Sequence, residues 1–138
     1  ALPISRTDTL CQFESISDDF GATWTVPRPN TFFSSPASPM LVRKVDDMVL
    51  AIFNPIPNYT TRKVTRFSGR TPFVMAVSRN DGESFDAVHI LEDDPYLGYC
   101  YPAIFDGGDY ILVGYYVLEG KDRNLDSNKI IKIQKSEL

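Results

Sequence analysis

The stretch 54–70 gathers four basic side chains and no acidic one, a composition that suits the binding of an anion. Its basic residues are Arg62, Lys63, Arg66 and Arg70. A guanidinium group makes two parallel hydrogen bonds to a carboxylate or a phosphate, and a basic rim raises the local concentration of anionic ligands. A solvated loop has the same composition, so its chemistry depends on where the neighbouring strands place this stretch.

Acidic and aromatic side chains follow one another just before residue 100. Glu92, Asp93 and Asp94 suit acid–base chemistry as paired carboxylates, although a solvated loop also explains them. Tyr96 and Tyr99 come next and are expected either to pack or to stack against a sugar ring. One His and two Cys are too few for a Cys/His zinc site, and we expect neither a metal nor a cofactor.

The composition excludes several classes of protein. A chain of 138 residues fits one domain, and 43% apolar and 12% aromatic residues suffice for a core. Its 14 basic and 18 acidic residues give a net charge of −4, which disfavours non-specific binding to nucleic acids. The longest apolar run, 48–53, is far shorter than the roughly 20 residues of a membrane helix, so we expect no membrane span.

The first residues give little information on the compartment. They lack the charged start and the long apolar stretch of a signal peptide. The first residue is Ala rather than Met, which is consistent with the removal of an upstream segment. The compartment stays open, with secretion slightly favoured over the cytoplasm.

Short β-branched and aromatic runs, separated by turn residues, predict an antiparallel all-β chain. Apolar residues nowhere keep a helical spacing over three turns. Strands are expected near 9–16, 24–27, 38–45, 48–54, 71–78, 86–91, 101–105, 110–117 and 129–135. Runs 48–53, 73–77 and 110–117 are almost entirely apolar, which predicts burial on both faces. Tight hairpin turns are expected at 46–47 and 106–109.

An internal repeat organises these strands. The segment 17–24 and the segment 78–85 both read Ser-x-(Asp/Asn)-x-Gly-x-(Thr/Ser)-aromatic, and they begin 61 residues apart. Such a segment is an Asp box, in which Gly permits a positive φ and the Asp or Asn side chain closes the turn. The Asp-box residues are Ser17, Asp19, Gly21 and Trp24 in the first copy and Ser78, Asn80, Gly82 and Phe85 in the second. We expect Trp24 and Phe85 to be buried between sheets.

A 61-residue period with about four strands per unit is typical of β-propeller blades. The strands then divide into the end of one blade at 1–35, a complete blade at 36–94 and an incomplete last blade at 95–138. Since propellers close with four to eight blades, we expect part of a larger propeller, completed by the same full-length chain or, less simply, by partner chains.

The alternating directions of a four-stranded meander predict which ends of the strands meet. The hairpins and Asp boxes lie at one end of the sheets. The opposite end collects the start of the first strand of the last blade, with Tyr99 and Tyr101. It also collects the stretch 54–70 and Arg70, which precedes the third strand of the complete blade. Ligand sites favour such loop-bearing ends.

The two Asp boxes and two further strings resemble the sialidase superfamily, and more narrowly its bacterial BNR-repeat, sialidase-like glycosidases. The strings are Gly69-Arg70-Thr71-Pro72-Phe73-Val74-Met75-Ala76-Val77-Ser78 and Gly98-Tyr99-Cys100-Tyr101-Pro102-Ala103-Ile104. The resemblance covers roughly residues 15–135 and implies a six-bladed propeller. It also implies a site with three arginines on a substrate carboxylate, a Tyr nucleophile paired with Glu, and an Asp acid/base.

By its position, Arg70 resembles the third arginine and Tyr101 the nucleophile of that family. The resemblance implies that the other catalytic groups lie in earlier blades. A neutral nucleophile avoids repulsion from an anionic sugar. Tyr96, Tyr99 and Arg66 complete the residues that we expect to contact the substrate.

Three functions are compatible with these residues. The first is a glycoside hydrolase that releases a terminal, anionic sugar from a glycoconjugate or oligosaccharide. The second is a non-catalytic propeller that binds carbohydrate or protein, which would bind glycans without hydrolysis. The third is a polysaccharide lyase on the same scaffold, whose products would absorb in the ultraviolet. The first is the function that we expect.

Overall fold

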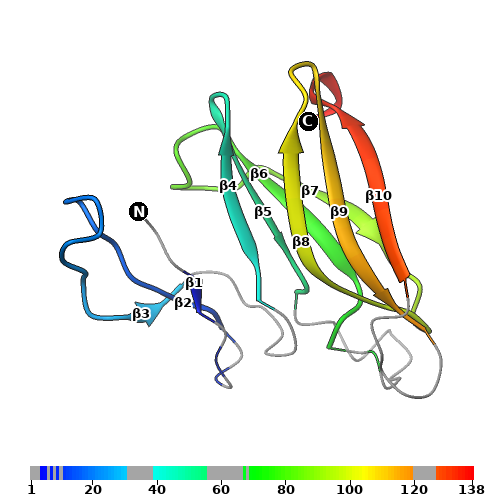
Figure 1. Ribbon diagram of the computed structural model, residues 1–138, viewed down its shortest axis with the longest axis horizontal. Helices are drawn as coiled ribbons and strands as arrows, with labels where there is room; N and C mark the ends of the chain where they lie inside the picture. Colours follow the sequence, from blue (N-terminus) through cyan, green and yellow to red (C-terminus); the bar gives the residue numbers. More distant parts are fainter. Residues whose placement is uncertain are drawn as a thin grey trace.

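The computed structural model describes residues 4, 5, 7, 9, 11–30, 39–55, 67, 69–119 and 127–138. These residues form three antiparallel sheets and one short 3₁₀ turn, η1 (Figure 1). The strands are β1 Ile4–Ser5, β2 Phe13–Glu14, β3 Arg28–Pro29, β4 Leu41–Val45, β5 Met48–Phe53, β6 Phe73–Ser78, β7 Ala87–Glu92, β8 Gly98–Asp106, β9 Tyr110–Leu118 and β10 Ser127–Gln134, with η1 at Lys135–Glu137. The all-β fold and the partial propeller are confirmed. No helix in the described ranges has the length and apolar character needed to cross a membrane.

The sheet β4-β5-β6-β7 has four strands, and every strand pairs with its neighbour along the chain. Its two central strands are buried on both faces, as their apolar runs predict. The hairpin between β4 and β5 turns at 46–47, where Asp46 has a φ of +53°. Asp tolerates this left-handed conformation better than most residues.

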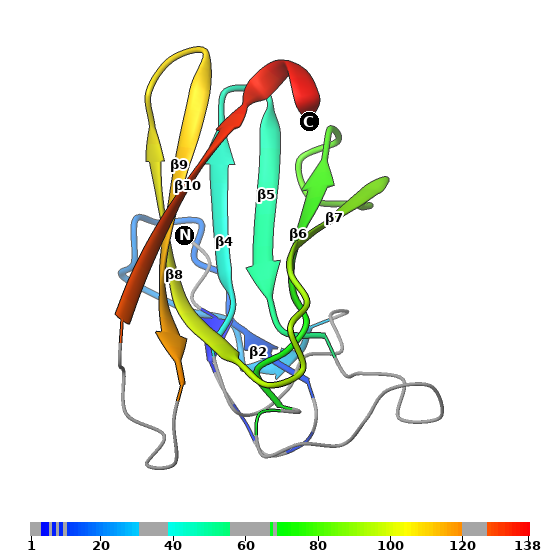
Figure 2. The same cartoon turned by 90° about the vertical axis from the view of Figure 1, so that its right-hand side faces the viewer.

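The sheet β8-β9-β10 has three strands, and β9 pairs with both of its neighbours. Its central strand β9 corrects one expectation, because burial alternates along it instead of covering both faces. Ile111, Val113, Tyr115 and Val117 face the core, whereas Tyr116 is 37% exposed. The reason is that β4–β7 covers one face of this sheet, and no described sheet covers the other (Figure 2).

The first sheet, β1-β2-β3, has strands of two residues each. The bounds expected for strands 9–16 and 24–27 were wrong. Among the described residues, β2 pairs with β3 over two residues only, and β1, which was not expected, pairs with the other edge of β2. Between β2 and β3 the first Asp box occupies much of the chain. Its side chains accept hydrogen bonds from backbone N–H groups, which in a strand would instead donate to the neighbouring strand.

The main core lies between the second and third sheets. Thirteen buried side chains form one cluster from strands β4 to β9. Phe73, Tyr99 and Tyr115 pack at its centre with ring centroids 5.0 to 6.3 Å apart. Edge-on and offset aromatic contacts at these distances are favourable beyond their buried area. The core therefore holds β6 and β8, the strands next to Arg70 and Tyr101, in a fixed relation.

One ionic cluster ties the hairpin ends of these two sheets together. The Nζ atom of Lys135 lies 2.6 Å from Asp46 in the β4–β5 turn and 2.8 Å from Asp106 at the end of β8. The hydrogen bonds that Lys135 donates to Asp106 and then to Asp46 raise the pKa of Lys135. Both hairpins and η1 therefore lie at the same end of the molecule, at the top of Figure 1.

The two Asp boxes make the same turn. In the first, the backbone N–H of Gly21 donates to Ser17 Oγ at 2.7 Å, and that of Thr23 donates to Asp19 Oδ1 at 2.9 Å. The equivalent atoms of the second box, from Ser78 to Ser84, lie 2.9 Å apart in both bonds. Gly21 and Gly82 have φ values of +92° and +89°, which a side chain would disfavour.

The aromatic residues of the two boxes differ in their surroundings. Phe85 packs against the second buried cluster, on the far face of β4–β7. Trp24 was expected in the core, but it is 46% exposed and its Nε1 donates to the carbonyl of Gly21 at 3.1 Å. The expectation was wrong for Trp24, because the buried clusters of the described residues all lie in the other two sheets.

The lowered pKa of Asp19, in the first Asp box, leads to a prediction on stability at acid pH. Hydrogen bonds from Thr23 and then Ser17 lower the pKa of Asp19 to about 2. A lowered pKa means that this carboxylate stabilises the fold above its unfolded pKa of about 4 and loses the effect as the pH falls to about 2. Asp19→Asn should keep the turn, because Asn80 closes the second box with the same acceptor atom.

We therefore expect the difference in unfolding free energy between wild type and Asp19→Asn to shrink from pH 5 to pH 2. Urea denaturation at several pH values measures it. Asp18→Asn, which changes the exposed neighbouring carboxylate, is the matched control. A difference that stays constant across this pH range would contradict the prediction.

Candidate active site

Arg70 and Tyr101 lie at the end of the sheets opposite the hairpins. Strand β8 begins at Gly98 and reaches the hairpin end at Asp106, so Tyr101 stands near its start. Strand β5 runs away from the β4–β5 hairpin, so the antiparallel strand β6 begins, at Phe73, at the opposite end of its sheet (Figure 2). Strand β8 begins at the same end. Arg70 precedes β6 by three residues. The alternation of strand directions thus brings together residues from two blades.

The two side chains are in contact. The Cζ atom of Arg70 lies 5.5 Å from the centroid of the Tyr101 ring, within the range of a cation–π interaction. The Tyr101 side chain is 41% exposed, and Arg70 is half-buried. The Nη1 atom of Arg70 is buried and has no hydrogen-bond partner within the described residues. A buried donor without a partner is costly, which makes this atom unusual among the described residues.

A bulge in β8 directs Tyr101 toward Arg70. The pairing of β8 with β9 shifts register between Cys100 and Ala103, and Tyr101 has a φ of +53°. Regular alternation from the buried Tyr99 would turn Tyr101 into the core. Instead its ring lies beside Arg70 and edge-on to Tyr116, at 6.3 Å. A bulky residue with positive φ is strained by about 1–3 kcal/mol, and such strain concentrates at functional sites.

This strain leads to a prediction on stability. Tyr101→Asn should leave the unfolding free energy unchanged or raise it by up to about 1 kcal/mol, because Asn tolerates the left-handed conformation and little buried area is lost. Tyr99→Ala, two residues away in the core, should cost about 3–5 kcal/mol. Urea denaturation of both variants measures the contrast. Equal losses in the two variants would show that Tyr101 is an ordinary packing residue.

Buried polar side chains hold the segment around Arg70. Asn54 Nδ2 donates to the carbonyl of Pro72 at 3.0 Å, which joins the two ends of the connection between β5 and β6. Thr71 Oγ1 donates to the carbonyl of Asp94 at 3.0 Å, which joins the same segment to the loop before β8. Neither residue was predicted from the sequence. Their signal is a polar residue at the end of an apolar strand, which is too common to single them out.

Tyr99 and Tyr96 occupy different environments. Tyr99 is 2% exposed and packs in the aromatic core, where burial, and then the charge of Glu92, raise its pKa. Of the two roles expected for Tyr99, the structure therefore supports packing, since a stacking platform needs an exposed ring. Tyr96 is 59% exposed in the loop between β7 and β8, and its backbone N–H donates to Asp94 Oδ1 at 2.8 Å. Arg66 and most of the stretch 54–70 lie outside the described residues.

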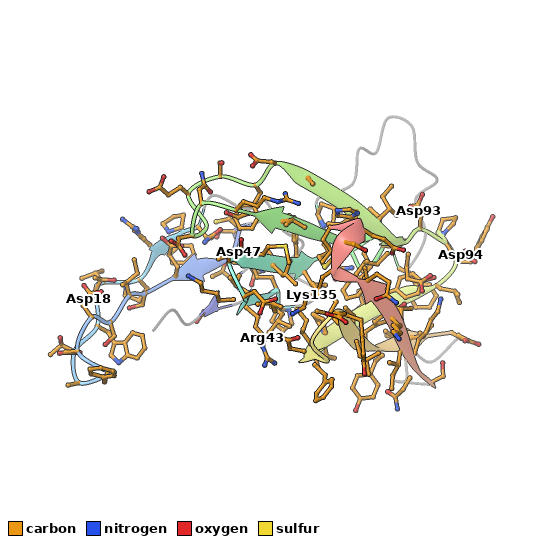
Figure 3. The ribbon with its side chains drawn as sticks, turned by 90° about the horizontal axis from the view of Figure 1, so that it is seen from above. Asp18, Arg43, Asp47, Asp93, Asp94 and Lys135 are labelled. Atoms are coloured by element: carbon orange, nitrogen blue, oxygen red, sulfur yellow. The ribbon has the colours of Figure 1, made fainter. Side chains whose placement is uncertain are left out.

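The acidic run has mainly structural contacts. Glu92 Oε1 accepts hydrogen bonds from the Tyr115 hydroxyl and from Lys129, and so joins β7 to β9 and β10. Burial and the bond to Glu92 raise the pKa of Tyr115. Asp93 and Asp94 lie on the side of the molecule away from Asp18 (Figure 3). Among the described residues, no group of three or more His, Cys, Asp or Glu side chains could hold a metal ion.

A shallow hollow of about 300 Å³ adjoins Tyr101 on the outer face of the last sheet. Tyr101, Tyr116, Asn128 and Lys129 contribute to its wall. The ammonium of Lys129 is already paired with Glu92, at the edge of this hollow. Arg70 differs from Lys129 in this respect. Among the described residues, its Nη1 atom has no hydrogen-bond partner.

Comparison with known proteins places this geometry in a family. A search of curated proteins finds no match. Residues 3–115 match the family described as BNR repeat-like domain, and this range includes both Asp boxes, Arg70 and Tyr101. The match covers most of the chain, and both the repeat and the blades agree with it. The chain belongs to the BNR repeat-like domain family, within the sialidase and BNR-repeat superfamily.

Proposed function

We propose that the chain is part of a sialidase-like exo-glycosidase, in which Arg70 binds the acid group of a terminal sugar and Tyr101 attacks its anomeric carbon. The observation that carries this proposal is the unsatisfied Nη1 of Arg70 beside the exposed, strained Tyr101. Membership in the BNR repeat-like family supports it at the level of the superfamily.

Each of the two residues has a separate task. The guanidinium of Arg70 holds the carboxylate by charge-assisted hydrogen bonds and orients the sugar over the Tyr101 hydroxyl. In the chemical step the Tyr101 Oη–anomeric carbon bond forms as the bond to the leaving oxygen breaks. The leaving oxygen takes a proton from an acid, and the phenol proton passes to a base. Water then releases the sugar from Tyr101.

The acid and the base are expected in other blades. A phenol ionises near pH 10, so its attack at neutral pH needs a general base. Within the described residues, Glu92 is a half-buried carboxylate on the strand before β8, but it is engaged by Tyr115 and Lys129. We therefore assign both proton-transfer roles to parts of the propeller beyond these residues.

The full-length gene product tests the proposal on a panel of 4-methylumbelliferyl glycosides of acidic and neutral sugars. Release of the fluorophore from acidic sugars only, without a new ultraviolet absorbance in the sugar, is the expected result. An unsaturated, ultraviolet-absorbing sugar product would instead indicate a lyase. Binding on a glycan array without any release would indicate a non-catalytic propeller, and either outcome would overturn the proposal.

A further inference from the structure

Four consecutive residues at the start of β8 each contact Arg70. Tyr101 lies beneath the guanidinium, as described above. The backbone N–H of Tyr99 donates to the carbonyl of Arg70 at 2.9 Å. Gly98 and Cys100 alternate with these two. A Cβ atom at Gly98 would lie 3.3 Å from the Cβ of Arg70, and the Arg70 guanidinium is near enough to act on the Cys100 thiol. One short segment therefore touches Arg70 from its backbone to its charged end.

Gly98 is a position where a side chain does not fit. A Cβ atom built on it would lie 3.3 Å from the Cβ of Arg70 and 3.0 Å from the ring of Phe67. Leu118 closes the third side, at 3.4 Å. Distances of 3.0 to 3.4 Å are shorter than ordinary carbon–carbon contacts. Glycine at this position thus permits the close approach of the Arg70 segment to β8.

Cys100 is buried next to the segment that carries Arg70. Its side chain is fully buried and clusters with Phe67 and Leu118, the same residues that surround Gly98. Burial raises the pKa of the Cys100 thiol, and the neighbouring Arg70 guanidinium acts against this rise. A thiol is a weak hydrogen-bonding group, so it limits the movement of the guanidinium without occupying it as a carboxylate would.

We propose that Gly98 and Cys100 are positioning residues, which hold the guanidinium of Arg70 against Tyr101 in the orientation that binds the acid group of the sugar. Neither residue touches the reacting atoms. This inference rests on the proposed function. Strand β8 then supplies both the nucleophile and the support for the arginine that orients its substrate, so the two cannot shift independently.

The main variant is Gly98→Ala in the full-length protein. Its Cβ would lie 3.3 Å from the Cβ of Arg70 and should push this residue away by a few tenths of an ångström. We expect a rise of up to about tenfold in KM for an acidic 4-methylumbelliferyl glycoside. The kcat should change less, because Arg70 binds the acid group in the ground state as well as in the transition state.

Gly108→Ala is the matched control. Gly108 lies at the β8–β9 turn with a φ of +88° and no atom within 4 Å of a built Cβ. This variant should lose stability, as Ala at a positive φ does, and leave KM unchanged. It separates a general loss of stability from the displacement of Arg70.

The second readout needs no activity. In protein with ¹⁵N-labelled arginine, the ring of Tyr101 should shift the Arg70 Hε signal upfield, and Arg70→Lys identifies that signal by its loss. Gly98→Ala should move this resonance toward the ordinary arginine position, and Cys100→Ala should move it in the same direction. Cys100→Ser, which keeps a small polar group, should restore most of the wild-type shift.

A raised KM together with a lost ring-current shift supports the proposal. An unchanged Arg70 resonance in both Gly98→Ala and Cys100→Ala would overturn it, whatever the activity. If the wild-type protein releases no sugar, the proposed function fails and the resonance alone decides on the positioning roles. If Gly98→Ala does not fold, the same measurements on Cys100→Ala decide.

Discussion

Replacing Tyr101 with Phe in the full-length protein should lower kcat on an acidic fluorogenic glycoside by at least about a thousandfold, as expected when a covalent nucleophile is removed. The phenyl ring keeps the contacts with Arg70 and Tyr116, which involve the ring rather than the hydroxyl. Substrate binding and the unfolding midpoint should therefore stay close to those of the wild type. Turnover and urea denaturation measure these properties.

Tyr110→Phe is the control for this experiment. Tyr110 lies at the hairpin end of β9, with Lys132 above its ring at 4.0 Å. Removing its hydroxyl should leave kcat unchanged. Wild-type turnover in Tyr101→Phe would remove Tyr101 from the mechanism.

Arg70→Ala should reduce kcat/KM about 10- to 100-fold on an acidic glycoside, because a hydrogen bond to a charged group contributes about 1.5–3 kcal/mol. Arg70→Lys should recover only part of this loss, since an ammonium lacks the planar pair of donors. A substrate whose carboxylate is converted to an amide should lose much of its dependence on Arg70. Initial rates with the paired substrates measure the effect.

Arg79→Ala is the matched control, because Arg79 follows the same strand β6 at its other end. It donates to the carbonyl of Leu138, away from Tyr101. It should leave kcat/KM unchanged on both substrates. Equal losses for the acid and the amide in Arg70→Ala would contradict a role in binding the carboxylate.

The sequence predicted the placement of Arg70 and Tyr101 because that placement depends on strand direction alone. Two hairpins and one repeat fix which ends of β6 and β8 meet. The cation–π contact needs in addition the bulge that turns Tyr101 out of the core. Family membership was likewise predicted from the Asp boxes and the two strings, and it is confirmed.

Other features depend on contacts that a sequence pattern does not contain. Two-residue alternation gives no signal for the bulge at Tyr101, which a change of register introduces. The exposure of Trp24 and of one face of β9 depends on which sheets surround them. The roles proposed for Gly98 and Cys100 could not be predicted, because a sequence pattern does not show that Arg70 and Phe67 pack on β8. The blade boundaries and the catalytic roles stay predictions.

The most direct test of the account is to trap the sugar on the nucleophile. An acidic glycosyl fluoride with a second fluorine on its ring should react with the full-length protein, lose fluoride and leave a slowly hydrolysed aryl glycoside on a phenol oxygen. Fragment-ion mapping should place the added mass on Tyr101 and not on Tyr99. A label on another residue, or labelling of Tyr101→Phe at the wild-type rate, would contradict the account.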